Sequence, residues 1–122
     1  MGSFAHNIRP HVDAELRAAD EAEARGQPDA AFTHLERAHV LGQASTVEHV
    51  RVHWRMLLWG LRRRDVRECV GQVIRIGGAA TKTVFGRVPR GNTGGSNVSP
   101  FAPMPIPPDL DERIREARAS AG

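Results

Sequence analysis

The chain has 122 residues, of which 40% are hydrophobic and 25% are charged, and its formal net charge is +3. This length is typical of one domain with a modest core. No apolar run approaches the ~18 residues that a membrane span needs, and the first residues lack the apolar stretch of a secretory signal. With Cys69 as the only cysteine, these features predict a cytoplasmic protein with no membrane contact and no intrachain disulfide.

The basic residues are almost all arginines, since Lys82 is the only lysine, and acidic residues are interspersed among them. The densest cluster, 62–64, falls where one predicted helix ends, and cations there offset the helix dipole. The chain has no basic stripe with aromatic residues for base stacking and no recognised reading motif. We therefore expect no nucleic-acid partner.

Hydrophobic spacing and turn residues predict four helices in the first two thirds of the chain. Residues 1–12 are expected to form an N-terminal arm, and residues 13–25 an amphipathic helix. After a turn at residues 26–29, a second helix extends to about Leu41, with Ala31, Leu35 and Ala38 facing the core. Gly42 is expected to cap that helix.

Ser45 followed three residues later by Glu48 predicts a capping box that begins a third helix, which ends near residue 61. Its apolar residues predict a buried arc at Val47, Val50, Trp54, Leu57 and Leu58. Asp65 with Glu68 predicts a second capping box, and the fourth helix is expected to end at Gly77 and Gly78.

The Gly/Pro-rich segment after residue 80 excludes long helices and still contains apolar residues. We expect it to form an ordered strap across the helical body, followed by a short helix capped by Asp109. Gly26 and Gly60 lie 34 residues apart, the tetratricopeptide period. The prediction is an all-α, four-helix tetratricopeptide-like double hairpin: an arm (1–12), a helical body (13–80), and a Gly/Pro-rich strap with a short terminal helix (81–122).

Four side chains are spaced so that a helical hairpin would bring them together: Glu36, His39, His49 and His53. Spacings of three and four residues place each pair on one helix face, with His39 opposite His49 and Glu36 beside His53. Three imidazoles and a carboxylate suit a divalent transition metal, which could be zinc, iron, copper or nickel. The helical wheel places His49 and His53 in a groove at the boundary of the core. The alternative is that they are ordinary, partly buried histidines that bond to backbone or to glutamates.

Other candidates are weaker. His34 is a candidate outer-sphere group or alternative ligand, and His6 or His11 could reach the site only if the arm folds back. Cys69 and Met56 are interpreted as core residues.

Four segments together resemble a family of small bacterial proteins that is catalogued as domain of unknown function 3703: HLERAHVLGQ, HVRVHWRML, GQVIRI and GNTGGSNVSPFAPMPIPPDL. Members of this family are often found among metal-resistance genes. This context agrees with the interpretation of the histidines as metal ligands, and the resemblance supplies no mechanism and no catalytic residues.

The sequence favours a small cytoplasmic metal-binding helical protein, which would be a metal-dependent enzyme with a small-molecule substrate or a metal-resistance or homeostasis factor. The alternative is a tetratricopeptide-like protein-protein interaction module without metal, with Arg51, Arg55 and Arg62 facing an acidic partner. A homodimer that uses Trp54 and Trp59 is compatible with both. Whether the protein is an enzyme stays open.

Overall fold

The computed structural model describes residues 3–85, 94–95 and 103–121, with residues 79–85 described by their helical backbone alone. It contains helices α1 (Phe4–Ala24), α2 (Pro28–Gly42), α3 (Thr46–Arg63), α4 (Val66–Phe85) and α5 (Pro108–Ala119). Every regular element in these ranges is a helix, which confirms the all-α prediction.

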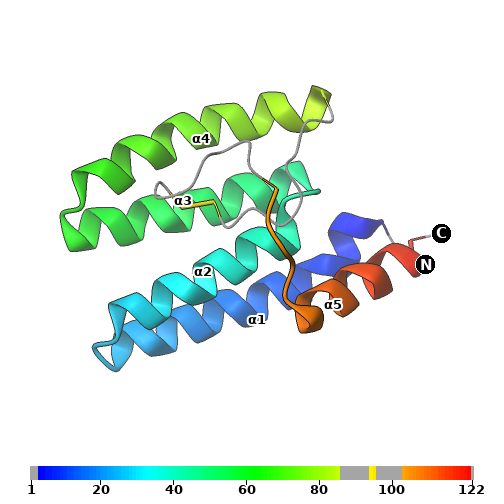
Figure 1. The fold of residues 1–122 in the computed structure, drawn as a ribbon, viewed down its shortest axis with the longest axis horizontal. Coiled ribbons are helices and arrows are strands. Elements are labelled where there is room, and N and C mark those ends of the chain that lie inside the picture. The colour runs from blue at the N-terminus through cyan, green and yellow to red at the C-terminus, as the bar shows by residue number, and fades with distance from the viewer. Residues whose placement is uncertain (1–2, 86–93, 96–102, 122) are drawn as a thin grey trace.

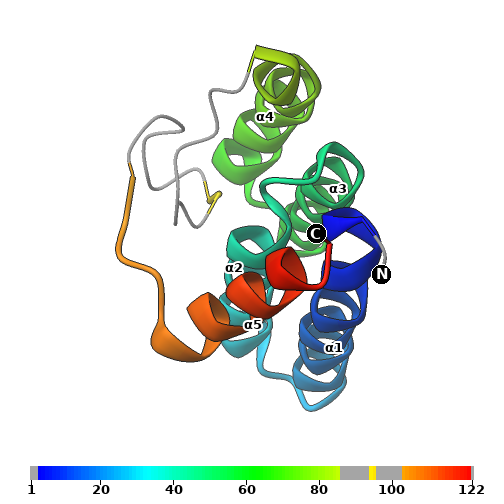
Figure 2. The ribbon, with the colours of Figure 1, turned by 90° about the vertical axis from the view of Figure 1, so that its right-hand side faces the viewer.

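The first four helices form two consecutive hairpins (Figure 1). Helix α1 packs along α2, α3 packs along α4, and the contact between α2 and α3 joins the hairpins. Helix α5 packs against both α1 and α2, as the end-on view in Figure 2 shows. The tetratricopeptide-like character of these hairpins stays a prediction.

Helix α1 begins nine residues before the predicted start at Asp13, so the expectation of an arm at residues 4–12 was wrong. Ser3 caps the helix by accepting a hydrogen bond from the His6 amide. Pro10 lies inside the helix at an exposed position. Ile8 and Val12 are fully buried, so this part of the chain belongs to the helical body.

The turn between α1 and α2 follows the prediction. Gly26 has a φ of +71°, the left-handed conformation that ends many helices, and Pro28 occupies the first turn of α2. Gly42 behaves differently: it is the last helical residue of α2 and has no positive φ. A Cβ at Gly42 would lie 2.9 Å from the Cβ of Glu48, so glycine is needed there for close approach of α2 and α3.

Ser45 caps α3 as predicted, because its hydroxyl accepts a hydrogen bond from the Glu48 amide at 3.4 Å. The predicted buried face of α3 was wrong. Val47 and Trp54 are exposed, and the helix instead buries its other side: Glu48, His49, Val52, His53, Met56, Trp59 and Gly60. The histidines therefore lie inside the protein, not in a boundary groove.

Helix α4 begins as predicted, with the Glu68 amide donating to the Asp65 carboxylate at 3.0 Å. It continues through Gly77 and Gly78 to Phe85, so the predicted end was wrong. In α5, Asp109 lies in the first turn and pairs with Arg37; it does not cap the helix. Residues 86–93 and 96–102 of the predicted strap lie outside the described residues.

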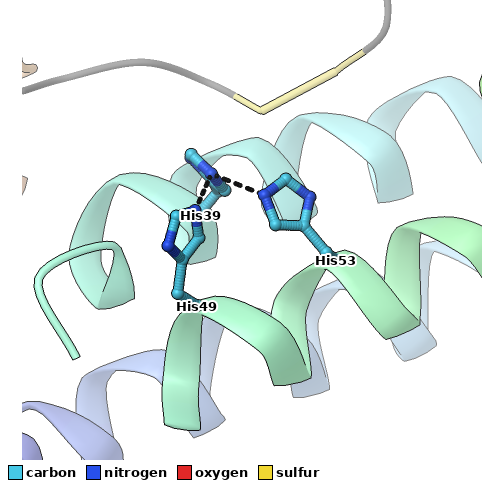
Figure 3. Close-up of side chains that lie close together, drawn as sticks. All are labelled: His39, His49 and His53. Carbon is cyan, nitrogen blue, oxygen red and sulfur yellow. Dashed lines mark hydrogen bonds between the residues drawn. The ribbon is translucent and has the colours of Figure 1, made fainter. Parts of the chain in front are cut away.

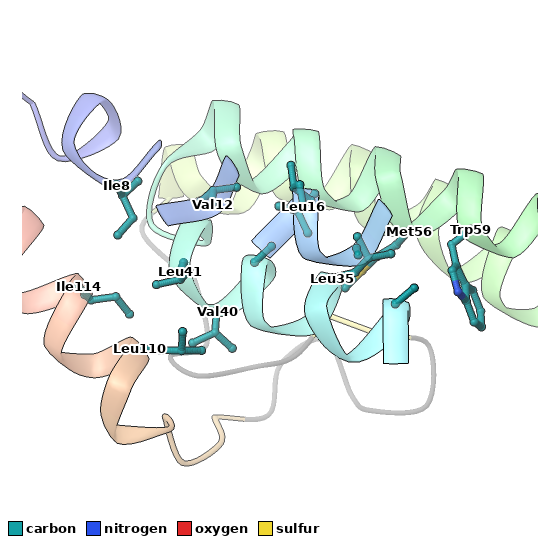
Figure 4. Packing of buried hydrophobic residues seen from close by; sticks show 14 of the residues in the cluster. Ile8, Val12, Leu16, Leu35, Val40, Leu41, Met56, Trp59, Leu110 and Ile114 are labelled. Carbon is teal, nitrogen blue, oxygen red and sulfur yellow. The ribbon is translucent and has the colours of Figure 1, made fainter. Parts of the chain in front are cut away.

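The core lies where α1, α2, α3 and α5 meet (Figure 4). Ala31, Leu35 and Ala38 are buried as predicted. Burial of each large aliphatic side chain contributes about 1.5–3 kcal/mol. The largest apolar side chains with almost no exposure are Ile8, Val12, Leu41, Val52, Met56 and Leu110. This packing holds the C-terminal end of α2 against α3, where the histidines lie.

Candidate metal centre

Three histidines from α2 and α3 point their Nε2 atoms at one another (Figure 3). The Nε2 of His39 lies 3.0 Å from the Nε2 of His49 and 3.1 Å from the Nε2 of His53. The three residues are 3%, 5% and 2% exposed, respectively. They form a group of potential ligand atoms within 4.8 Å of one another, the kind of group that can hold a metal ion.

The local structure explains why these side chains meet. His39 lies in the last turn of α2, and His49 and His53 occupy one face of α3, four residues apart. The short turn between the helices reverses the chain, and Gly42 lets the two backbones approach closely. The sequence spacing therefore predicted this convergence correctly.

Gln72 of α4 fixes the protonation of one ring. Its amide nitrogen donates to the Gly94 carbonyl at 2.9 Å and to the Glu68 carboxylate. The amide oxygen must then be the atom that faces His53, and it lies 2.5 Å from Nδ1 of that ring. An oxygen can only accept, so Nδ1 carries the proton and the Nε2 of a neutral His53 presents a lone pair to the centre of the cluster.

This arrangement is the outer-sphere support that metal-binding histidines usually have: the non-ligating nitrogen donates to an oxygen, which orients the ring and makes it more basic. Glu68 is buried and extends the chain of contacts from His53 through Gln72 to a negative charge. Arg75, also on α4, is half-buried. Burial lowers the pKa of its guanidinium, and the negative charge of Glu68 opposes that shift.

The Gly94–Gly95 segment covers the histidines. Both residues are buried, and a Cβ at Gly94 would lie 2.5 Å from Cδ2 and 2.8 Å from Nε2 of His39. Gly94 also has a φ of +84°, in the left-handed region that favours glycine. Only glycine therefore fits against the ring, and the segment shields the cluster on this side.

The spacing of the nitrogens can be compared with that of a bound ion. A tetrahedral zinc ion with Zn–N bonds of ~2.0–2.1 Å holds its nitrogen ligands about 3.3 Å apart. The two separations that involve His39, 3.0 and 3.1 Å, are a few tenths of an ångström shorter than this value, and all three ligand atoms lie within 4.8 Å of one another. The residues therefore fit a first-row transition metal with three imidazole ligands.

The fourth predicted ligand lies elsewhere. Glu36 does not belong to the group of histidines that could hold a metal. It is half-buried in a pocket beside Pro105, Pro107 and Leu110. At 100° per residue, Glu36 points about 60° away from His39 around α2, toward the side that the C-terminal segment covers.

The remaining histidines contact other groups. His34 lies 2.8 Å from the carboxylate of Glu15, which also binds Arg37. His6 and His11 line a surface pocket beside α5. Met56 is fully buried, as predicted, and Cys69 is only half-buried.

Gln72, Glu68 and Gly94 were not predicted as part of the site. The sequence offered one signal, because Glu68 and Gln72 are four residues apart and share a face of α4. The contact of Gly94 with His39 spans 55 positions along the chain, and only the three-dimensional structure reveals it.

Residues 6–114 match the family described as "Protein of unknown function (DUF3703)". The chain belongs to this family. The match includes all three clustered histidines, Glu68, Gln72 and Gly94. No curated protein and no solved structure was found to match the chain.

In the described part of the chain, no helix combines the length and the apolar character that a bilayer span requires.

Proposed function

We propose that this DUF3703 protein binds one divalent transition-metal ion through His39, His49 and His53. The observation that carries the proposal is that the Nε2 atoms of His49 and His53 lie 3.0 and 3.1 Å from the Nε2 of His39, together with the Gln72 contact that leaves a lone pair on His53. Imidazole ligands suit zinc, iron, copper and nickel.

The low exposure of the three rings favours a protein that holds or delivers the metal, as in resistance or homeostasis. Three ligands leave one position of a tetrahedral ion for water or a small substrate, as in catalytic zinc sites. The Gly94–Gly95 segment packs on His39 and restricts access from its side. Storage or delivery in the cytoplasm is therefore the role that we propose, with catalysis as the second candidate.

The metal-free alternative has less support. Arg51, Arg55 and Arg62, which were expected to face an acidic partner, form ion pairs with Asp13, Asp20 and Glu23 of α1. These contacts explain the arginines without an external ligand.

The proposal is tested by the metal content of untagged protein, as purified and after titration with zinc, iron, copper or nickel. The wild type is expected to take up one ion per chain, and a His49→Ala/His53→Ala variant none. A His34→Ala variant, which changes a histidine outside the cluster, serves as the matched control and is expected to bind like the wild type. The absence of tight uptake of all four metals by the wild type would refute the proposal.

A further inference from the structure

Helices α3 and α4 expose large apolar side chains on the side away from the histidines. On α3 these are Val47, Trp54 and Leu61, which are 64%, 53% and 57% exposed. On α4 they are Val66, Val70, Val73 and Ile74, which are 55–74% exposed. We call these seven side chains the outer apolar face. All the large hydrophobic side chains that are exposed in the described ranges belong to it.

The spacing shows that the two sets form continuous stripes. The α3 residues recur every seven positions, which is two helical turns, and the α4 residues recur at intervals of three and four. At 100° per residue, the stripe residues of α3 lie about 80–160° around the helix from the histidines, and those of α4 lie about 100–160° from Gln72. Helices α3 and α4 pack side by side. On each helix the stripe lies away from the histidines or from Gln72, so we infer that the two stripes share one side of the hairpin.

This apolar surface is large for a lone chain. Seven half- to three-quarters-exposed side chains present on the order of 800 Å² of largely apolar surface, the amount that each partner contributes to a standard interface. The largest apolar patch of a typical monomer measures ~300–600 Å². Helix α3 also departs from the usual pattern, since it exposes this apolar stripe although it buries two histidines beside Val52, Met56 and Trp59.

We infer that the outer apolar face is the interface of a homodimer, in which it packs against the same face of a second copy. A two-fold interface needs one self-complementary patch, and this face supplies enough area from each copy for a stable complex. The inference does not depend on the metal site, because the histidines lie on the other side of α3.

Charge selects the relative direction of the two copies. Arg64 and Arg67, at the turn between α3 and α4, are exposed and form no ion pair within the described part of the chain. A parallel arrangement would bring these cations of both copies together, whereas an antiparallel arrangement places them at opposite ends. We therefore assign the antiparallel arrangement to the dimer.

A membrane surface fits this face less well. Helices that lie on membranes carry cations on their polar side for anionic lipids. The arginines that flank the α3 stripe, Arg51, Arg55 and Arg62, instead pair with carboxylates of α1.

The test is sedimentation velocity of the untagged full-length chain in a chelating buffer, over about 1–100 μM. The chelator excludes association through bridging metal. The wild type is expected to sediment as a dimer of about 27 kDa, twice the chain mass of 13.4 kDa. A Trp54→Glu/Val70→Glu variant is expected to be monomeric, with dimer affinity reduced at least ~100-fold. Because both positions are exposed, its helical circular dichroism should match that of the wild type.

The control is Ala119→Glu/Ser120→Glu, which introduces the same two negative charges at exposed positions at the C-terminal end of α5 and should remain dimeric. If the double variant loses its helical signal, Val73→Lys alone provides the same test. A wild type that is monomeric throughout would overturn the inference, and co-sedimentation of that monomer with anionic lipid vesicles would assign the face to membranes. A dimer that survives both interface variants would also overturn it.

Discussion

Replacement of Gln72 by leucine tests whether the outer sphere of the histidine cluster supports metal binding. Gln72 accepts from Nδ1 of His53 at 2.5 Å and donates to the Gly94 carbonyl at 2.9 Å and to the Glu68 carboxylate. Leucine has a similar volume and makes none of these contacts. His53 would then lose the acceptor that fixes its tautomer, and its Nε2 would carry a proton in part of the population.

The expected loss follows from the nature of this contact. Removal of the outer-sphere partner of a metal-binding histidine typically lowers metal affinity 10- to 100-fold, or about 1.4–2.7 kcal/mol. Gln72→Leu should show a loss of this size, and Gln72→Glu, which keeps an oxygen opposite Nδ1, should show a smaller one.

The assay is titration with zinc against a competing chelator, with circular dichroism to confirm the fold. Gln27→Leu is the matched control, because Gln27 is exposed and its side chain makes no capping hydrogen bond. It should bind zinc like the wild type. If Gln72→Leu is folded and its affinity lies within twofold of the wild type, the proposed role of Gln72 is wrong.

Three further predictions concern the cover of the site, the core and the docking of α5. Gly94→Ala would place a Cβ 2.5 Å from Cδ2 of His39 and would put alanine at a φ of +84°. Calorimetry should therefore show at least ~10-fold weaker zinc binding, and an unchanged affinity would contradict the contact between Gly94 and His39. Met56→Ala should lower the free energy of unfolding in urea by about 2–5 kcal/mol, and a loss well under ~1 kcal/mol would contradict full burial. The hydrogen bond from Arg37 lowers the pKa of Asp109 in the folded state. The ionised Asp109 therefore stabilises the fold at pH values above the ordinary pKa of an aspartate, and this stabilisation is lost as the pH falls below about 4. The free energy of unfolding should therefore fall less with acid in Asp109→Asn than in the wild type. The difference should be no more than about 1 kcal/mol because the pair is half exposed, and identical curves would refute the role of this pair.

Local signals predicted the turns well. Gly26, Ser45 and Asp65 mark helix ends through backbone conformation or capping hydrogen bonds, which depend on a few neighbouring residues. Gly77 and Gly78 misled the prediction because glycine permits a helix end without enforcing one. The predicted start of α1 was too late, although Ile8 and Val12 continue the spacing of Leu16 and could have revealed the earlier start.

The face of α3 could not be predicted from hydrophobicity alone. The most apolar arc of the helix carries Val47 and Trp54, and amphipathic reasoning buries that arc. In the structure, packing against α2 buries His49 and His53 instead. Trp59, which was considered for a homodimer interface, instead packs on Phe32 and donates to the Pro28 carbonyl at 2.9 Å. Polar burial becomes favourable only with partners such as Gln72, which the sequence did not identify.

The histidine spacing, in contrast, predicted the cluster because it combines two strictly local facts. The i, i+4 spacing places His49 and His53 on one face, and the short turn brings His39 opposite them. Glu36 and His39 are three residues apart, a spacing that is also compatible with a shared helix face. This spacing does not determine which of the two side chains points at α3, and only His39 belongs to the cluster.

The most direct test of the metal site is X-ray absorption spectroscopy of the zinc-loaded protein, which reports the ligand atoms and their distances. We predict a shell that contains three imidazole nitrogens at about 2.0–2.1 Å, reduced to fewer imidazoles in His53→Ala. A shell of oxygen or sulfur ligands without imidazole, or a spectrum that does not change in His53→Ala, would contradict the assignment of His39, His49 and His53 as the metal site.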